Sequence, residues 1–215
     1  MSDILLIGGH GKVALRLAPL LVARGDTVTS VIRNPDQVAD VEATGATALV
    51  LDIEHADVEA LAGAVRGRDA IVWSAGAGGG SPQRTYGVDR DAAIRSMEAA
   101  QGAGVSRHVM VSYHGAGPDH GVPEDNPFYA YAQAKAAADA HLRASGLDWT
   151  VLGPGTLTLD EPTGRIDVGR FEDGAPVSRG NVALVVAAAL ADSGTIGRTI
   201  EFRDGDTPIA EAIQA

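Results

Sequence analysis

The sequence predicts an α/β fold in which a parallel, doubly wound sheet of about seven strands carries helices on both faces. Strand-like and helix-like segments alternate regularly along the chain, which is typical of βα units. Several strand-like segments, "AIVW" and "HVMV" among them, are uninterrupted apolar runs, as expected for strands buried on both faces. Small or polar residues follow the strands, as in "GGHG" and "SAGAGGG".

This alternation assigns each element in turn. The predicted strands are 4–8, 27–33, 47–52, 70–75, 108–113, 150–153 and 198–203. The predicted helices are 12–24, 36–44, 57–66, 85–103, 129–144 and 179–191. The whole chain, 1–215, is expected to form one domain, in which the weakly periodic segment 154–177 serves as a lid or a wall of the substrate pocket. Ligands of such sheets bind at the carboxyl ends of the strands, so functional residues are expected there.

Composition excludes several classes of protein. A net charge of −11 argues against a general nucleic-acid-binding role, and no apolar run approaches the roughly 20 residues of a membrane span. The chain has no cysteine, so disulfides and thiolate metal sites are excluded. Met1-Ser2-Asp3 leads into a strand without a basic region, so no secretory signal and a cytoplasmic location are expected. A monomer and a homodimer both stay open.

The stretch "ILLIGGHGKVALRLAPLL" is a strand, a glycine-rich turn and a helix. In such a turn Gly8 lets the chain change direction, Gly11 lets the backbone approach a pyrophosphate, and Ala14 lets the helix pack closely. The helix N-terminus and a nearby cation favour phosphate groups. The turn therefore predicts a dinucleotide, unless it serves only to pack the strand against the helix. The predicted contacts on this turn are Gly8, His10, Gly11, Lys12 and Val13.

The end of the second predicted strand bears on the choice of dinucleotide. NAD is commonly held there by an acidic residue, whereas this chain reads "VIRNP", with no carboxylate until Asp36. Arg33 places a cation where the 2′-phosphate would lie, so NADP is predicted over NAD. The alternative is that Arg33 is an ordinary solvated arginine.

Residues at the ends of later strands are further expected to border the cofactor. Asp52 could accept a hydrogen bond from the adenine amino group while Ile53 packs on the ring, or Asp52 could cap the turn that follows it. The remaining predicted contacts are Ala75, Gly76 and Pro154.

A second group of residues opens the predicted helix 129–144. Tyr131 and Lys135 are four residues apart in "YAYAQAK" and so share one helix face. A nearby ammonium lowers the pKa of a tyrosine, which makes Tyr131 a candidate acid/base. Tyr129 faces elsewhere and is the poorer candidate. Ser112, at the end of the fifth strand, could hydrogen-bond the substrate oxygen that exchanges the proton, and Lys135 could also contact the cofactor ribose.

With these motifs the chain resembles the atypical short-chain dehydrogenase/reductases, in their NAD(P)H-binding branch of epimerases and reductases. The resemblance rests on "IGGHGKVALRLAPLL", "VIRNPDQ", "YGVDRDAAIRSMEAAQGAGVSRHVMVSYHGA" and "YAQAKAAADAHLRASGLDWTVLGPG", and it covers nearly the whole chain. It implies a Rossmann fold, NADP, and a catalytic set of Ser112, Tyr131 and Lys135. The fourth catalytic position falls on Asp89, where the family normally has Asn, which puts its proton-relay role in question.

Two functions of different classes follow. The leading one is an NADPH-dependent oxidoreductase that reduces a small carbonyl, quinone or flavin-like acceptor, with Tyr131 giving the proton and Ser112 holding the developing oxyanion. The alternative is an NADP-binding redox sensor or regulator with little turnover. The substrate pocket is expected between 76–84, 115–128 and 156–177. No metal is expected, because the spacing of the histidines at 108, 114 and 120 matches no recognised ligand geometry.

Overall fold

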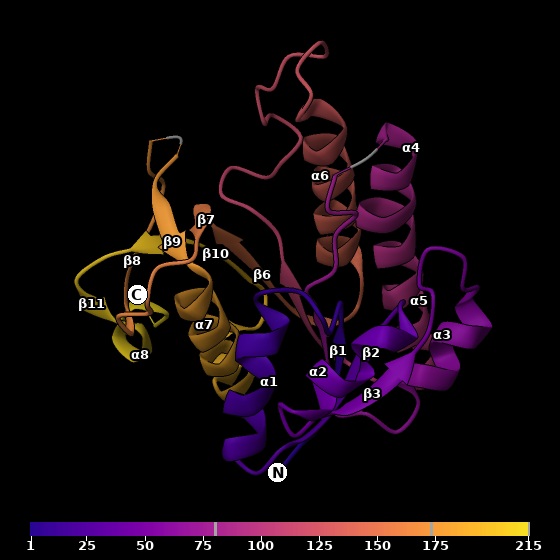
Figure 1. Cartoon of the computed structure of the whole chain (residues 1–215). Coiled ribbons are helices and arrows are strands. Elements are labelled where there is room, and N and C mark those ends of the chain that lie inside the picture. Colours follow the sequence, from indigo (N-terminus) through magenta and orange to yellow (C-terminus); the bar gives the residue numbers. More distant parts are fainter. Residues whose placement is uncertain (80, 173, 215) are drawn as a thin grey trace.

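A computed structural model describes residues 1–79, 81–172 and 174–214 and shows one large sheet flanked by helices (Figure 1). Gly80, Asp173 and Ala215, which fall within ranges predicted above, lie outside the described residues. The strands of the large sheet are β1 (Asp3–Ile7), β2 (Thr27–Ile32), β3 (Thr47–Val50), β4 (Ala70–Trp73), β5 (Arg107–Val111), β6 (Asp148–Pro154), β8 (Arg165–Val168), β10 (Arg198–Asp204) and β11 (Thr207–Pro208). A small second sheet pairs β7 (Thr156–Thr158) with β9 (Pro176–Ser178).

Helices connect these strands. They are α1 (Ala14–Ala23), α2 (Val38–Glu42), α3 (Val58–Val65), α4 (Pro82–Thr85), α5 (Ala93–Ala103), α6 (Tyr129–Ala144), α7 (Arg179–Ala191) and α8 (Ile209–Ala212). Short helical turns add η1 (Pro35–Gln37), η2 (Tyr86–Ala92) and η3 (Ser193–Thr195). Among the described helices, none is both long and apolar enough to cross a membrane.

The strand order of the large sheet is β11-β8-β10-β6-β5-β4-β1-β2-β3. The seven strands from β10 to β3 are all parallel and correspond to the seven predicted strands, which confirms the doubly wound α/β class. The order reverses at β1, which pairs with β2 on one side and β4 on the other, and this reversal opens a crevice at the carboxyl ends.

The sheet extends further than the sequence predicts. Beyond β10 it continues through β8, which pairs antiparallel with both β10 and β11. The segment 154–177, predicted to be irregular, contains β7 and β8 and the start of β9. These strands have two to four residues, and within them only Ile166 of β8 and Val177 and Ser178 of β9 are fully buried, so they lack the long apolar runs that reveal the parallel strands.

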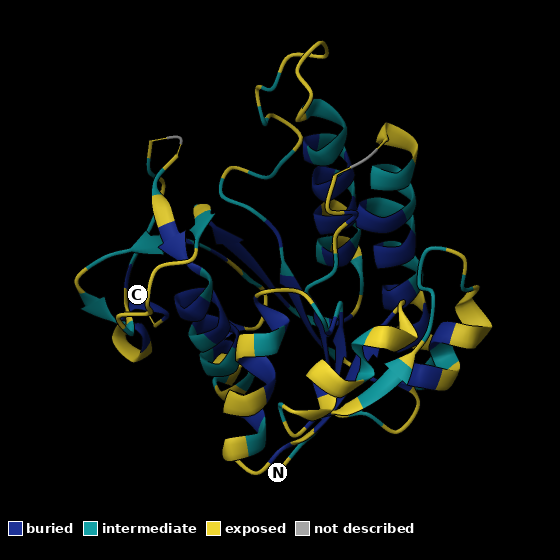
Figure 2. Cartoon of the chain, in the orientation of Figure 1, coloured by how far each residue is buried: buried dark blue, intermediate teal, exposed yellow. Residues whose placement is uncertain are grey.

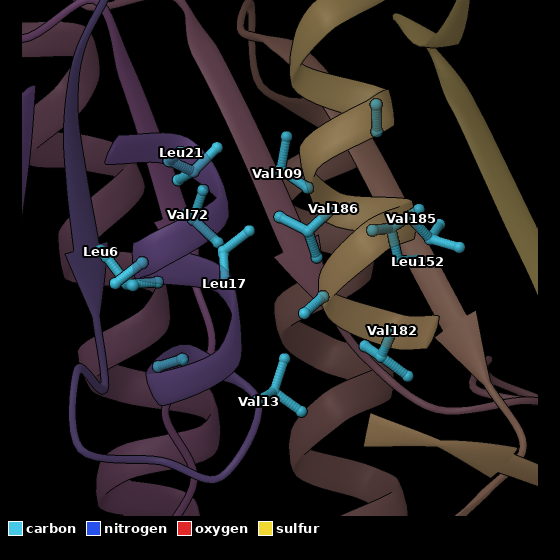
Figure 3. Packing of buried hydrophobic residues seen from close by; sticks show 14 of the residues in the cluster. Leu6, Val13, Leu17, Leu21, Val72, Val109, Leu152, Val182, Val185 and Val186 are labelled. Atoms are coloured by element: carbon cyan, nitrogen blue, oxygen red, sulfur yellow. The ribbon is translucent and has the colours of Figure 1, made fainter. Parts of the chain in front are cut away.

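Both faces of the parallel sheet are buried, because side chains of each strand alternate between two cores. Leu6, Val72 and Val109 lie on the face covered by α1 and α7, where Figure 3 shows them beside residues of both helices. Their strand neighbours Ile71 and Met110 belong to the opposite core, under α3, α5 and α6. Figure 2 shows the resulting buried centre and exposed helix rims. Full burial of each such aliphatic side chain stabilises the fold by about 1.5–3 kcal/mol.

The predicted helix 85–103 is not continuous. Residues Tyr86–Ala92 form a π-helical stretch between α4 and α5, with one more residue per hydrogen-bonded ring than an α-helix has. This wider turn changes the direction in which side chains leave the helix, and its central Asp89 is buried. The helical period of the sequence continues through this stretch, so the sequence pattern gave no sign of the change.

Gly8 and Gly102 form a matched test of this packing. Gly8 has φ +89°, and an added Cβ would lie 2.6 Å from the Ala75 backbone, whereas Gly102 of α5 has no atom within 4 Å of the same position. We expect Gly8→Ala to lower the free energy of unfolding by at least about 1–3 kcal/mol, as overpacking does. Gly102→Ala should raise it by up to about 1 kcal/mol through helix propensity. Urea unfolding measures both, and equal effects would contradict the close approach at Gly8.

Candidate active site

The glycine turn joins β1 to α1 and is wedged between two neighbouring strands. The amides of Gly8 and Gly9 both donate to the Val31 carbonyl, at 3.2 and 2.8 Å. A Cβ on Gly9 would lie 2.5 Å from the Ser30 Cβ. Gly8 and Gly9 are thus required for packing, which is the alternative that the sequence left open. Gly11 is exposed, its amide donates to the Gly8 carbonyl at 2.9 Å, and it borders a cavity.

This cavity, of about 280 Å³, lies at the carboxyl ends of β1 to β4. Its apolar wall includes Val31, Ile32 and Leu51, and the glycine turn forms its other side. The predicted cofactor residues that line it are Gly8, His10, Gly11, Arg33, Asp52, Ile53, Ala75 and Gly76. A close backbone turn at a helix N-terminus, an apolar wall and an adjacent arginine together suit the phosphates and the flat base of a dinucleotide.

Other predicted cofactor residues lie outside the lining of this cavity. Lys12 is exposed at the start of α1, and Val13 is buried in the core beneath α1 and α7. Pro154 is buried at the end of β6 and borders a different cavity. Lys135 lies fully buried under the sheet ends.

Arg33 lies at the rim of the cavity and is exposed. Its Nη1 is 3.7 Å from Glu54 Oε2, while Arg84 Nε is closer to the same oxygen, at 3.2 Å. Glu54 and Arg84 also line the cavity, and sequence reasoning missed both. Arg84 already pairs with Glu54, and the contact of Arg33 with the same carboxylate is the longer of the two. The Arg33 guanidinium is therefore able to turn toward an anion.

Asp52 and His10 have local partners. Asp52 Oδ1 accepts from the Glu54 amide at 3.1 Å, and its Oδ2 contacts His55 Nδ1 at 2.9 Å, so the capping alternative is the one present in the structure. His10 Nε2 lies 2.9 Å from Asp40 Oδ2 of α2. Both residues keep a place on the cavity wall.

Ser112 and Tyr131 line a second, larger cavity of about 710 Å³ at the ends of β5 and β6. The Ser112 amide donates to the Leu152 carbonyl at 2.8 Å, which fixes this residue where β5 ends. Tyr113, Phe128 and Tyr131 pack against one another on the cavity wall, with ring centroids 5.1–5.6 Å apart. The walls come from the long loop between β5 and α6 and from the segment around β7 and β9, which lie within two of the ranges where the substrate pocket is predicted. Figure 1 shows where these segments run in the chain.

A third cavity, of about 300 Å³, lies between the other two. It is bordered by the loop after β4, by Asp89, and by Phe128 and Tyr131, which also line the large cavity. Gly76 lines the first cavity, and the next residue, Ala77, lines the third. The loop after β4 therefore borders both the cavity beside the glycine turn and the cavity beside Tyr131.

The sequence predicts that the Lys135 ammonium lowers the pKa of Tyr131, and this prediction is wrong. The Lys135 Nζ donates to the Val111 carbonyl at 2.8 Å and to Met110 Sδ at 3.4 Å, so the ammonium is held against β5. Burial, with the charges of Asp89 and Asp139, raises the pKa of Tyr131 instead of lowering it. Tyr131 therefore keeps its proton near neutral pH and is a weaker acid than a free tyrosine.

Asp89 comes into this region through the π-helical turn. Its Oδ2 accepts from the Ala77 amide at 3.0 Å, and its Oδ1 is buried with no hydrogen-bond partner among the described residues. Burial raises the pKa of Asp89, although Lys135, Ala77 and Arg84 oppose the shift. The carboxylate thus anchors the loop after β4 beside Tyr131.

Asp139 is a residue of this region that sequence reasoning missed. It is fully buried on α6, four residues beyond Lys135, and its Oδ2 is 2.5 Å from Ser112 Oγ. The signal in the sequence was the spacing: Asp139 follows Lys135 by four residues, as Lys135 follows Tyr131. Tyr113 was also missed, and burial raises its pKa to about 12.

Comparison with known proteins identifies the family. The family described as NAD(P)H-binding matches residues 8–193. The chain belongs to this NAD(P)H-binding family. Within it, the chain is an atypical short-chain dehydrogenase/reductase, and the resemblance inferred from the motifs is confirmed.

Three relatives illustrate the range of the family. A Bacillus subtilis protein named "Uncharacterized sugar epimerase YhfK" is 36% identical, and the alignment covers 98% of each chain. A Bacillus halodurans structure, named provisionally as an NAD-dependent epimerase/dehydratase, has a TM-score of 0.92 at 32% identity and covers 100% of this chain and 99% of its own. ChuY of Escherichia coli O157:H7, named as an anaerobilin reductase, has a TM-score of 0.78 at 25% identity, covering 95% and 98%.

Replacing Asp89 tests the burial of its charge in this NAD(P)H-binding protein. Because its pKa is raised on folding, the native state binds more protons, and the free energy of unfolding falls as the pH rises above the unfolded value of about 3.9. Asparagine removes the charge and keeps an oxygen for the Ala77 amide. We expect Asp89→Asn to stabilise the protein against urea by more at about pH 7 than at about pH 3, where the carboxyl is largely protonated in both the folded and the unfolded state. The same difference at both pH values would contradict a desolvated carboxylate.

Proposed function

We propose that this protein is an NADPH-dependent reductase of a planar conjugated acceptor, a quinone, a flavin-like molecule or a conjugated carbonyl. The observation that carries the proposal is the position of Tyr131, a phenol that lines both the 710 Å³ cavity and the cavity bordered by the loop after β4. A group that keeps its proton at neutral pH and faces a ligand cavity can protonate a reduced substrate.

The size and lining of the large cavity support the acceptor class. Its volume lies in the range that holds a drug-sized ligand, well above the need of a small aldehyde or ketone. The packed rings of Tyr113, Phe128 and Tyr131 offer faces and edges on which a flat conjugated molecule can stack. The name of ChuY, a reductase, agrees with this direction of the reaction.

The roles of the residues follow from their positions. Bound NADPH supplies the hydride. Tyr131 gives a proton to the reduced acceptor, and Ser112 hydrogen-bonds the atom that receives this proton. The ammonium of Lys135, held by the Val111 carbonyl, supplies a positive charge near Ser112 and Tyr131. Asp89 anchors the loop after β4 through the Ala77 amide, and the glycine turn with Arg33 binds the phosphates. The segment 154–177 closes one side of the acceptor pocket.

Arg33→Asp tests the preference for NADPH. A phosphate contact to a charged group contributes about 1.5–3 kcal/mol, so we expect the Kd for NADPH to rise about 10- to 100-fold. The Kd for NADH should change little, because NADH has no 2′-phosphate. Arg66→Asp, the same charge change at the exposed C-terminal end of α3, is the matched control. Calorimetric titration measures these constants, and an equal loss for both nucleotides would overturn the assignment of NADP.

Tyr131→Phe tests the proton transfer. We expect kcat for a quinone or conjugated carbonyl to fall by at least about 10²-fold, the low end for general acid catalysis, while NADPH binding is unchanged. The control is Tyr129→Phe, which removes only a hydroxyl that accepts from Gln133 Nε2. NADPH consumption is followed over a panel of acceptors. Unchanged turnover would remove Tyr131 from the mechanism, and NADPH binding without turnover of any acceptor would favour the sensor.

A further inference from the structure

Asp139 lies in the same row of α6 as Tyr131 and Lys135, with successive spacings of four residues. Such spacing places side chains on one helix face, and here that face meets the end of β5, where Lys135 Nζ donates to the Val111 carbonyl. Asp139 is 0% exposed and Lys135 is 1% exposed. A fully buried carboxylate is costly unless it is compensated, so its retention needs an explanation.

The hydrogen-bond partner of Asp139 is Ser112. Their side-chain oxygens are 2.5 Å apart, a short distance typical of a hydroxyl donating to a carboxylate, and Ser112 is only 4% exposed. The other oxygen of Asp139, Oδ1, has no hydrogen-bond partner within the described ranges. The Ser112 hydroxyl is therefore the contact through which Asp139 reaches the site.

The charges around Asp139 favour a carboxylate that accepts. Burial raises the pKa of Asp139 overall, while Lys135, the Ser112 hydroxyl and Arg143 oppose that rise and favour the ionised form. Tyr113 and Tyr131 face it as neutral phenols, and Asp89 lies across Lys135. Lys135 thus acts electrostatically on both carboxylates, and Ser112 is the one hydrogen-bond donor that the described residues give to Asp139.

We propose that Asp139 is a positioning residue that acts through Ser112: its carboxylate accepts the hydrogen bond of the Ser112 hydroxyl, so that Ser112 in turn accepts a hydrogen bond in the substrate cavity. A hydroxyl has one proton and two lone pairs, so a serine that donates to Asp139 presents lone pairs to the cavity. This reverses the direction inferred from the sequence, in which Ser112 donates to an oxyanion.

The inference rests on the proposed function and narrows it. Lone pairs on Ser112 accept the new O–H or N–H of the reduced acceptor after Tyr131 has given its proton. The site therefore favours acceptors whose reduced form carries a proton on the reacting oxygen or nitrogen, as hydroquinones, alcohols and reduced flavins do.

The first test needs no substrate. NMR of ¹³C-aspartate-labelled protein follows the titration of Asp139, whose signal is assigned by its loss in Asp139→Asn. Donation to the ionised form lowers a carboxyl pKa, so Ser112→Ala should raise the pKa of Asp139. The Ser106 hydroxyl donates a similar hydrogen bond, of 2.7 Å, to Asp148 Oδ2. This exposed pair lies at the amino ends of β5 and β6, away from Ser112, so Ser106→Ala is the control. An Asp139 titration unaffected by Ser112→Ala would overturn the proposal, as would an equal response to Ser106→Ala.

The second test uses an acceptor that the protein turns over. Ser112→Ala and Asp139→Asn should each lower kcat about 10- to 100-fold with the KM for NADPH unchanged, and the double variant should be no slower than Ser112→Ala alone. Asp148→Asn should retain kcat. Independent, multiplying losses would show that Asp139 does not act through Ser112. If no acceptor is reduced, the proposed function fails, while the NMR titration still decides the Asp139–Ser112 contact.

Discussion

The close approach of the β1 end to β4 is the constraint on which the functional edge of this protein depends. Only a residue without a Cβ can occupy position 8, because its φ is positive and the Ala75 backbone lies within 2.6 Å of where a Cβ would be. This contact brings the glycine turn against the loop after β4 at the point where the strand order reverses. The loop that follows β4 lines both the cavity proposed for the dinucleotide and the cavity beside Asp89 and Tyr131.

The charge of the site is a local property that opposes the charge of the whole chain. A net charge of −11 disfavours an anionic ligand at long range. Backbone amides at a helix N-terminus and the Arg33 guanidinium act within a few ångströms, where they outweigh a diffuse field that salt screens. A strongly acidic protein can thus bind a polyphosphate without a basic surface.

Burial, more than pairwise attraction, determines the chemistry around Tyr131. Lys135 is close in sequence and shares its helix face, yet its ammonium is committed to the Val111 carbonyl. Desolvation and two carboxylates then raise the pKa of Tyr131. The same desolvation makes the contacts of Asp89 and Asp139 consequential, because an unpaired charge in such a place is far more costly than one in water.

The sequence by itself determined the elements with strong local patterns: the seven parallel strands, the helix that carries Tyr131 and Lys135, the glycine turn, and the family. These follow from periods and turns encoded within short windows. Only the tertiary structure decided the antiparallel edge at β8, the π-helical turn that buries Asp89, and the contact between Ser112 and Asp139. The partners in that contact are 27 residues apart in the chain, and a hydrogen bond, a desolvation or a change in pKa depends on neighbours from distant segments. Local pattern therefore fixes which side chains are available, and packing fixes what each of them can do.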